Sequence, residues 1–504
     1  MMNEKLDLIP LPVSVKTHDS VFRSPVLPVI EGGSVFQNEI DLFKEQLCLY
    51  TDQSGAGSRT ENSKKITLVM DSSLAAEAYT LEIRPQGLIL KAASPAGAYH
   101  GLQSLRELIL SSGRDDGIVL PCAEIADYPR FPWRGFMLDC SRYFYSTEFI
   151  KKIIDALSLH HINVFHWHLT DDQGWRLPVQ KYPLLTEIGS KRLEYRYRDM
   201  YSGGFYSRED IRDIAAYAAS RHVEIVPEVD LPGHTSSVLA AYPGLGCTGG
   251  PYRVEDRFGI CEDVLCAGND GIFDLADAVF DTLAELFPSP WVHIGGDEVL
   301  FNRWDACPKC RKRLEETGLT HSRELQSWIT VKLARMLSER GKTAIGWDEI
   351  LEDSEQYRLP EETAVMSWRG RAGGLAASRL GHRVVMSPNT EGCYFDYRNY
   401  GHHEEIGRDL VSTAAQCYNM DPAGPEMTDS EASLILGGQA NLWSEVIYAG
   451  KIAEYMIFPR ICALAEALWT PRDSKNFEDF KVRLPVHQKR LERLGLLQYR
   501  GPLE

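Results

Sequence analysis

The sequence predicts an α/β protein in which a (β/α)8 TIM barrel is preceded by a smaller α+β domain. Three observations lead to this prediction. The chain has 504 residues, which is more than one compact core normally holds. From about residue 134 onward, short apolar stretches alternate with amphipathic helical patterns, as is typical of parallel β/α units. Eight such units fit into the remaining stretch of roughly 370 residues, as a closed barrel with enlarged loops requires.

The first predicted domain covers residues 1–127. Three stretches of it have the apolar patterns of strands, and the last two form a hairpin around the turn at Pro85. Residues 94–110 carry apolar side chains at helical spacing, with Pro95 in the first turn. This domain shows no catalytic constellation. The predicted strands are residues 66–70, 78–83 and 87–91.

The second predicted domain covers residues 128–504 and consists of the barrel with a helical C-terminal end. Residues 127–133 contain prolines and aromatic residues and indicate the connection between the domains. One helix is expected to begin at Ser207, an N-cap residue followed three places on by Asp210. Another is expected at residues 325–340. The predicted barrel strands are residues 135–139, 163–169, 223–229, 291–294, 343–347, 364–368, 383–386 and 434–439.

Polar and aromatic residues follow nearly every predicted barrel strand. The first strand runs into Asp139 and Arg142, the second ends in the His-Trp-His sequence at 166–168, and the eighth leads to Trp443 and Glu445. In a TIM barrel, functional residues collect at the C-terminal ends of the strands. Taken together, these strand ends predict a deep pocket with aromatic walls, carboxylates and one guanidinium group.

The stretch 291–299 carries the most informative strand end. Gly295 and Gly296 follow a buried strand and allow the backbone to turn or a ligand to come close. Two adjacent carboxylates come next, Asp297 and Glu298. Carboxylates in one enclosed place repel each other, which raises one pKa and leaves the other group ionised. Acid catalysis at an acetal carbon needs this combination of proton donor and negative charge. The alternative interpretation is an Asp-Glu pair that caps a helix.

Composition and charge exclude other classes of function. The formal net charge is −17 and no long run of Lys and Arg offsets it, which disfavours nucleic acid as a partner. The N-terminal residues are polar and lack the apolar core of a signal peptide, and no apolar run reaches transmembrane length. We therefore expect a soluble cytoplasmic protein without a membrane partner.

The 11 cysteines are an odd number and are scattered, so free thiols are expected rather than a disulfide framework. Cys307 and Cys310 have the spacing of half a zinc site. No second Cys-x-x-Cys follows, and Cys261 and Cys266 are spaced differently. The sequence therefore predicts no bound metal and no cofactor, and the role of Cys307 and Cys310 as metal ligands stays open.

Five stretches of the barrel domain form a distinctive set of motifs. They are 134–142 (RGFMLDCSR), 163–176 (NVFHWHLTDDQGWR), 227–234 (PEVDLPGH), 293–298 (HIGGDE) and 438–445 (GQANLWSE). These motifs resemble those of the β-N-acetylhexosaminidases of glycoside hydrolase family 20. The resemblance covers essentially the whole chain, because that family also carries an N-terminal α+β domain before its barrel. The core catalytic positions show no departure from the family pattern.

The resemblance implies an exo-acting, retaining enzyme that removes terminal β-linked GlcNAc or GalNAc from a glycan by substrate-assisted hydrolysis. The 2-acetamido oxygen of the sugar attacks C1 and forms an oxazolinium intermediate. By this resemblance Glu298 is the acid and then the base. Asp297 holds the acetamido N–H and offsets positive charge on the ring, and Tyr394 donates its hydroxyl to the acetamido oxygen.

The same resemblance implies roles for the rest of the pocket. Arg142 and Glu445 are expected to grip the 3- and 4-hydroxyls through charge-assisted bonds, and Asp396 is expected to contact the 4- or 6-hydroxyl. Asp171 and His234 resemble a dyad that tunes Glu298, whereas the role of Asp230 stays open. The residues expected to enclose the acetamido methyl group and stack on the sugar are Trp347, Trp368 and Trp443.

Two alternatives belong to other classes of function. The histidines at 166 and 168 resemble the His-x-His of metal-dependent barrel hydrolases, but no Lys and no sufficient set of further histidines stand at later strand ends. A non-catalytic glycan-binding protein would be marked by loss of Asp297 or Glu298, and both are present. The sequence leaves open the preference between GlcNAc and GalNAc. It also leaves open whether the loop 244–270 shapes the aglycone side or makes a subunit contact, as in a homodimer.

Overall fold

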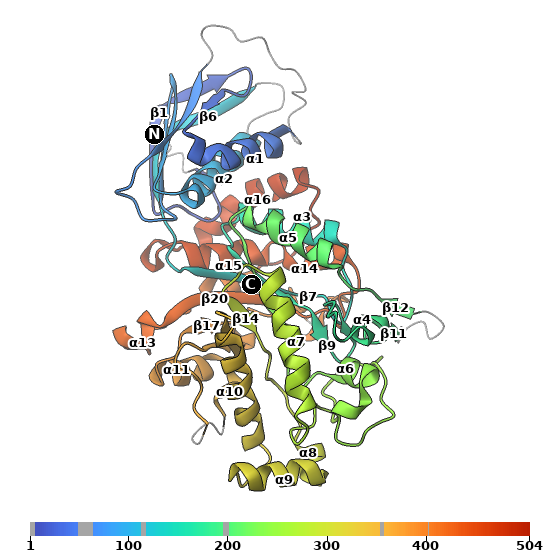
Figure 1. Cartoon of the computed structure of the whole chain (residues 1–504). Coiled ribbons are helices and arrows are strands. Elements are labelled where there is room, and N and C mark those ends of the chain that lie inside the picture. Colours follow the sequence, from blue (N-terminus) through green and yellow to red (C-terminus); the bar gives the residue numbers. More distant parts are fainter. Residues whose placement is uncertain (1–5, 49–63, 112–116, 195–200, 353–356, 402) are drawn as a thin grey trace.

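The computed structural model describes residues 6–48, 64–111, 117–194, 201–352, 357–401 and 403–504. An N-terminal sheet with two helices lies against one end of a larger barrel of strands and helices (Figure 1). Among the described residues, no helix is long and apolar enough to cross a membrane.

The N-terminal unit is a six-stranded mixed sheet with the strand order β1-β6-β4-β5-β3-β2. β4 pairs antiparallel with β5, as the hairpin prediction requires, and β3 pairs parallel with β5. The three strands predicted in this region are confirmed as β3, β4 and β5. The strands are β1 (Ser14–Ser24), β2 (Val29–Glu31), β3 (Lys65–Met70), β4 (Tyr79–Arg84), β5 (Gly87–Ala92) and β6 (Ile118–Asp127).

Helices α1 (Gln37–Cys48) and α2 (Pro95–Ser111) lie on the face of this sheet that is turned toward the barrel (Figure 1). α2 is buried along nearly its whole length, because it packs on the sheet on one side and on barrel helices on the other. Its start at Pro95 agrees with the prediction, since the fixed φ of proline suits the first turn of a helix.

Eight parallel strands close the barrel in the order β13-β14-β15-β16-β17-β20-β7-β8. Each of the eight strands predicted from the sequence corresponds to one of them, so the predicted TIM barrel is confirmed. The strands are β7 (Trp133–Asp139), β8 (Val164–His168), β13 (Glu224–Glu228), β14 (Trp291–His293), β15 (Thr343–Trp347), β16 (Ala364–Ser367), β17 (Val384–Met386) and β20 (Ile435–Leu442).

Side chains cap some of the helices that surround the barrel. Ser207 and Asp210 form a capping box at the start of α5, as predicted, and Ser146 caps α3. The longer helices are α3 (Thr147–Leu159), α5 (Arg208–Ala219), α7 (Gly271–Leu286), α9 (Pro308–Thr317), α10 (Glu324–Ser338), α11 (Arg371–Arg379), α14 (Gly450–Ile457), α15 (Arg460–Trp469) and α16 (Phe477–Arg493).

The loops at the C-terminal ends of the strands contain the shorter elements. These are β9 (Thr170–Asp171), β10 (Gly174–Trp175), α4 (Leu184–Glu187), β11 (Lys191–Leu193), β12 (Tyr201–Gly203), α6 (Ser236–Ala241), η2 (Pro243–Leu245), α8 (Asn302–Ala306), η3 (Asp348–Leu351), β18 (Tyr397–Arg398), β19 (Arg408–Val411), α12 (Ala414–Asn419) and α13 (Asp429–Ser433). The loops after β8, β13, β14 and β17 are therefore the enlarged ones.

Buried polar contacts join the N-terminal unit to the barrel. Trp469 of α15 packs in the hydrophobic core of the N-terminal unit, and its indole N–H donates to Oδ1 of Asp127 at 2.9 Å. Arg134 of β7 is fully buried, lies over the Trp469 ring and ion-pairs with Glu77. The barrel and the sheet thus share one continuous junction.

Candidate active site

A pocket opens at the C-terminal ends of the barrel strands. Its lining residues lie at or after the ends of β7, β13, β14, β15, β16, β17 and β20, so the fold brings together side chains far apart in the sequence. In TIM barrels this is the end at which function collects. The lining residues are Arg142, His234, Asp297, Glu298, Trp347, Trp368, Tyr394, Arg408, Trp443 and Glu445.

Nine of these ten residues are among those predicted from the sequence, and the tenth is Arg408. The two remaining predicted residues lie directly behind the pocket wall. Asp171 ion-pairs with Arg142 at 2.8 Å, and Asp396 ion-pairs with Arg408 at 3.1 Å. Both carboxyl groups are buried, so they act on the pocket through the arginines that they hold.

The turn after β14 presents the two adjacent carboxyl groups. Gly295 and Gly296 have φ angles of 67° and 94°, which glycine adopts without steric cost. A Cβ atom on Gly295 would lie 1.8 Å from Oδ1 of Asp230, and the amide of Gly296 donates to this same oxygen at 3.0 Å. Glu298 also has a positive φ, 51°, which is rare for a residue with a side chain. The turn therefore closes tightly on Asp230.

Asp297 and Asp230 form a buried carboxyl pair. Burial raises the pKa of Asp230 to about 7, and burial together with Asp230 raises the pKa of Asp297 well above its usual value. Oδ1 of Asp297 is buried and has no hydrogen-bond partner among the described protein atoms. An oxygen of each carboxyl group lies within 4.8 Å of an oxygen of the other, so the two groups cannot both ionise readily.

His234 lies between this pair, Glu298 and a second group of carboxylates. Its Nε2 is 3.7 Å from Asp297 and 3.6 Å from Glu298, and its Nδ1 is 3.2 Å from Oδ1 of Asp171. Burial alone would lower the pKa of His234, but the carboxylates of Asp171 and Asp297 raise it well above its usual value. A protonated imidazolium is thus held beside Asp297 and Glu298, and the expected dyad of Asp171 and His234 is present as a contact.

The guanidinium group of Arg142 is fixed from several sides. It ion-pairs with Asp171 at 2.8 Å and with Asp139 at 3.2 Å, and its Nε donates to Gln173 at 2.9 Å. It also lies 5.0 Å from the centre of the Trp443 ring. These contacts fix the orientation of the guanidinium group, which also lines the pocket.

Aromatic side chains form the walls of the pocket. The rings of Trp368 and Tyr394 are nearly parallel, at 14°, with centres 6.2 Å apart. Trp347 is buried at the floor, where its indole N–H donates to Glu228 at 3.0 Å, and its ring lies 5.8 Å from that of Trp443. Burial raises the pKa of Tyr394 well above its usual value, so its hydroxyl stays protonated and can donate a hydrogen bond.

Arg408 is the pocket residue that the sequence does not indicate. It begins β19, in the enlarged loop after β17, and ion-pairs with both Asp396 and Glu445. Arg142 and Glu445 both line the pocket, but the ion-pair partner of Glu445 is Arg408. Nothing around Arg408 marks it in the sequence, because it stands far from the end of any barrel strand and its two partners are set by the fold.

A cluster of buried polar side chains around Glu228 lies beneath the floor of the pocket. Glu228 receives contacts from His166 (2.9 Å), His293 (2.9 Å), His168 and the Trp347 indole. Burial opposes ionisation of Glu228, but the surrounding histidines hold its pKa well below the usual range. Glu228 therefore supports the floor of the pocket from below. The His-x-His residues are part of this hydrogen-bonded support.

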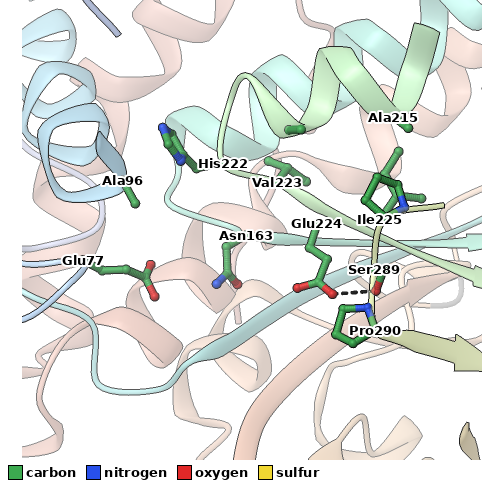
Figure 2. A pocket seen from close by; sticks show the side chains of 12 residues that line it. Glu77, Ala96, Asn163, Ala215, His222, Val223, Glu224, Ile225, Ser289 and Pro290 are labelled. Atoms are coloured by element: carbon green, nitrogen blue, oxygen red, sulfur yellow. Dashed lines mark hydrogen bonds between the residues drawn. The ribbon is translucent and has the colours of Figure 1, made fainter. Parts of the chain in front are cut away.

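A second cavity, of about 440 Å³, lies at the opposite end of the barrel strands. Figure 2 shows Asn163, Glu224 and Ser289, which stand at the starts of β8, β13 and β14, together with Glu77 of the N-terminal unit. Glu224 accepts a hydrogen bond from the Ser289 hydroxyl at 2.5 Å. The amino-terminal end of a TIM barrel serves stability rather than chemistry, so we place the active site in the other pocket.

A TIM barrel whose C-terminal pocket combines adjacent carboxyl groups with aromatic walls and fixed cations defines a glycoside hydrolase. Residues 131–472 match the domain described as glycosyl hydrolase family 20, catalytic domain, and residues 5–128 match glycosyl hydrolase family 20, domain 2. The chain therefore belongs to glycosyl hydrolase family 20. It is a glycoside hydrolase of the β-hexosaminidase kind.

Named relatives agree with this assignment. The chain is 41% identical over 436 residues to a β-hexosaminidase of Porphyromonas gingivalis, an alignment that covers 85% of this chain and 55% of that protein. It is 33% identical to a β-hexosaminidase of Akkermansia muciniphila, covering 88% and 90%. This chain thus spans little more than half the length of the first relative and most of the second.

Solved structures of the family share the whole fold. A family 20 exo-β-N-acetylglucosaminidase from Vibrio harveyi, in complex with N-acetylglucosamine, superposes with a TM-score of 0.88 at 30% identity, covering 99% of this chain and 79% of that one. A Streptomyces plicatus β-hexosaminidase in complex with GlcNAc superposes with a TM-score of 0.86 at 28% identity, covering 99% and 97%. Membership of this family disfavours both the metal-dependent hydrolase and the non-catalytic binding protein.

Proposed function

We propose that this chain removes terminal β-linked GlcNAc or GalNAc from glycans by substrate-assisted hydrolysis with retention of configuration. The observation that carries the proposal is the arrangement around the turn after β14. A buried carboxyl group, Asp297, stands beside a half-buried one, Glu298, and both face a pocket whose aromatic walls suit a sugar ring. This difference in environment supports different roles for the two groups.

In the first step, Glu298 gives its proton to the glycosidic oxygen. The bond between C1 and this oxygen breaks while the acetamido oxygen forms a bond to C1, which gives the oxazolinium ion. In the second step, the Glu298 carboxylate takes a proton from water, and the water oxygen attacks C1 from the face that the aglycone has left. The bond between C1 and the acetamido oxygen breaks at the same time, which restores the acetamido group. Two inversions give net retention.

Asp297 and Tyr394 are proposed to align the acetamido group as the nucleophile. The unpartnered oxygen of Asp297 can accept the acetamido N–H, and the protonated hydroxyl of Tyr394 can donate to the acetamido oxygen. Negative charge on Asp297 would also offset the positive charge that develops on the oxazoline ring. An aligned intramolecular nucleophile is worth up to roughly 7–11 kcal/mol in such reactions.

The charged groups on the other side of the pocket are proposed to bind the sugar hydroxyls. Arg142 is fixed by its carboxylates, and Glu445 has one buried oxygen, Oε2, without a hydrogen-bond partner. Asp396 also has a buried oxygen free of hydrogen bonds, Oδ1, and Arg408 joins the two acidic residues. Such a dense charged wall suits the terminal unit of a glycan, which supports exo action. The choice between GlcNAc and GalNAc would depend on these contacts to the 4-hydroxyl.

The test is hydrolysis of nitrophenyl β-GlcNAc, β-GalNAc and β-glucoside in parallel. The wild type is expected to release nitrophenol from the acetamido sugars and not from the glucoside, because the glucoside has no internal nucleophile. With natural aglycones, which are poor leaving groups and must be protonated, Glu298→Gln is expected to lose roughly 10²–10⁴-fold in kcat, as loss of a general acid does. Asp297→Asn should slow formation of the intermediate for all aglycones.

Asp305→Asn is the matched control, since Asp305 is exposed on α8 in the same loop and lies outside the pocket. It should keep wild-type kinetics. Normal hydrolysis of the glucoside by the wild type would exclude the acetamido group as nucleophile. Near wild-type rates for Glu298→Gln on poor leaving groups would exclude Glu298 as the acid.

A further inference from the structure

Four cysteines from two separate loops meet at one point of the structure. Cys247 and Cys266 belong to the long loop after β13, and Cys307 and Cys310 belong to the loop after β14. Three of them are buried and Cys247 is half-buried. None lines the pocket described above. We refer to these four residues as the four-cysteine cluster.

The distances between the sulfur atoms match a tetrahedron of metal ligands. Sγ of Cys266 lies 3.6 Å from Sγ of Cys310 and 3.8 Å from that of Cys307, and Cys247 lies 3.8 Å from Cys310. All four sulfurs lie within 4.8 Å of one another. Zinc binds cysteine sulfur at about 2.3 Å, which places tetrahedral sulfur ligands about 3.8 Å apart. A disulfide would require about 2.05 Å.

The backbone around the cluster is shaped for thiolates. The amide of Gly268 faces the sulfurs of both Cys266 and Cys310, where its partial positive charge favours thiolates. A Cβ atom on Gly268 would lie 2.2 Å from the carbonyl carbon of Lys309, so the two loops touch backbone to backbone at this glycine. Hydrogen bonds from amides to ligating sulfurs are the usual outer contacts of cysteine metal sites.

Charge also favours a metal at this place. A divalent cation with four thiolates carries a net charge of about −2, which needs nearby positive charge. The first two turns of α9, the helix that carries Cys310, are rich in basic residues, two of which also pair with carboxylates. The basic residues there are Lys309, Arg311, Lys312 and Arg313.

We propose that the four-cysteine cluster is a structural Zn²⁺ site that fastens the loop after β13 to the loop after β14. Binding forms four Zn–S bonds and releases the four thiol protons to solvent. Four protein ligands leave no open coordination position, so the ion supports the fold and takes no part in hydrolysis. This proposal replaces the sequence-based prediction of no bound metal.

The position of the site suggests what the zinc ion would hold. The loop after β14 also carries Asp297 and Glu298, and two further contacts join it to the loop after β13. Arg303 ion-pairs with Asp263 at 2.7 Å, and the indole of Trp304 donates to the carbonyl of Leu265 at 2.9 Å. The four Zn–S bonds would join these two loops directly, outside the pocket.

The first test is the metal content of the full-length wild-type protein, purified without chelators and under reducing conditions. Elemental analysis is expected to find about one zinc ion per chain, and a thiol-reactive mercurial should release it to a zinc-sensitive dye. Reduced, metal-free protein given Co²⁺ should develop the visible and near-ultraviolet bands of tetrahedral cobalt thiolates. Because these measurements use the wild type, they do not depend on the folding of a variant.

The second test compares Cys310→Ser with Cys261→Ser. Cys261 is a matched control, since it is a half-buried free cysteine of the same loop and lies outside the cluster. Cys310→Ser should lose zinc and show a lower Tm that added zinc does not restore, whereas Cys261→Ser should keep both. Glu298→Gln should also keep its zinc, which separates this site from catalysis.

Three results would overturn the proposal. One is wild-type protein that contains no zinc and takes up neither zinc nor cobalt after reduction. Another is stoichiometric iron, with the red colour of an iron tetrathiolate. The third is mass-spectrometric detection of disulfides among the four cysteines in protein that unfolds at the same temperature before and after reduction.

Discussion

At the scale of single residues, His234 favours the ionised form of Asp297. Its imidazolium lies 3.7 Å from Asp297 and lowers the pKa of that carboxyl group, against the larger effects of burial and of Asp230, which raise it. Asp297 has to be ionised to offset positive charge on the substrate. Removal of the imidazolium should therefore raise the pKa of Asp297, so that full activity is reached only at a higher pH.

We therefore expect His234→Gln to move the acidic limb of the pH profile of kcat/KM to higher pH by roughly one unit. A loss of packing alone would lower the rate at all pH values and leave the limb in place. The measurement is kcat/KM for nitrophenyl β-GlcNAc between pH 3 and 8. His382→Gln is the control, because His382, just before β17, is also buried but binds the carbonyl of Thr363, just before β16. An unmoved acidic limb in His234→Gln would contradict the proposed role.

The sequence could indicate most site residues because they stand directly at strand ends. Asp297, Glu298 and Trp443 are examples, because each closely follows a barrel strand whose apolar pattern can be recognised in the sequence. Arg408 could not be indicated in this way, since its place depends on the path of a long loop. The sequence also did not indicate that Glu228 supports the floor of the pocket. The three histidines that bind Glu228 come from two different strands, and only the fold brings them together.

At the scale of elements, the turn between β14 and the catalytic pair depends on glycine. Gly295 and Gly341 have the same φ of 67°, so alanine costs about 1–2 kcal/mol in backbone strain at either position. They differ in their surroundings. A Cβ atom on Gly295 would overlap Asp230, whereas a Cβ atom on Gly341 would meet nothing within 4 Å.

Gly295→Ala should therefore displace the turn that carries Asp297 and Glu298, with a loss of kcat/KM of at least about 100-fold. Gly341→Ala should show a modest decrease in thermal stability and wild-type kinetics. The measurements are thermal unfolding and kcat/KM for both variants. Equal activity in the two variants would mean that the turn tolerates the displacement and that Asp230 does not fix it.

The pattern of the barrel strands made the fold predictable, while the N-terminal sheet was predicted only in its centre. Strands β3, β4 and β5 have strong apolar patterns, whereas β1 and β2 are edge strands. Most residues of β1 are exposed, and β2 has only three residues, so neither has a clear alternation. β6 contains Pro121, which weakens the strand signal although the strand is mostly buried.

The four-cysteine cluster also could not be predicted from the sequence, because its residues come from separate elements. Cys307 and Cys310 have a recognisable spacing, but Cys247 and Cys266 are separated by a long loop. Sequence spacing identifies metal ligands only when pairs of them lie on one short turn. Here the second pair is assembled by the antiparallel bridge between Gly246 and Leu265, which places the two cysteines next to each other.

At the scale of the whole molecule, an ion pair between half-buried Glu77 and fully buried Arg134 helps to hold the N-terminal unit on the barrel. Glu77 binds Arg134 of β7 and, at 3.1 Å, His100 of α2. Burial would raise the pKa of Glu77, but the hydrogen bond from His100 and the charge of Arg134 lower it to about 2. Arg134 is fully buried, so loss of its partner would leave an uncompensated charge inside the junction.

We expect Glu77→Gln to lower the free energy of unfolding at pH 7 by about 2–4 kcal/mol. Because the pKa of Glu77 is lower in the folded protein than in the unfolded chain, its contribution is complete above about pH 4.5. It is lost as the pH falls toward about 2. The difference in unfolding free energy between wild type and variant should therefore be the same at pH 7 and 5.5 and smaller at pH 3.5, as measured by denaturant unfolding.

Glu124→Gln is the control for this prediction. Glu124 also binds an arginine, Arg84, but this pair lies on the exposed face of the N-terminal sheet and does not reach the barrel. Exposed pairs contribute little, so this variant should unfold as the wild type does. Glu77→Gln should in addition make the N-terminal unit and the barrel unfold in separate transitions. If both variants keep wild-type stability and a single transition, the Glu77–Arg134 pair does not hold the junction, which then depends on the packing around Trp469 and on the buried Glu107–Arg490 pair.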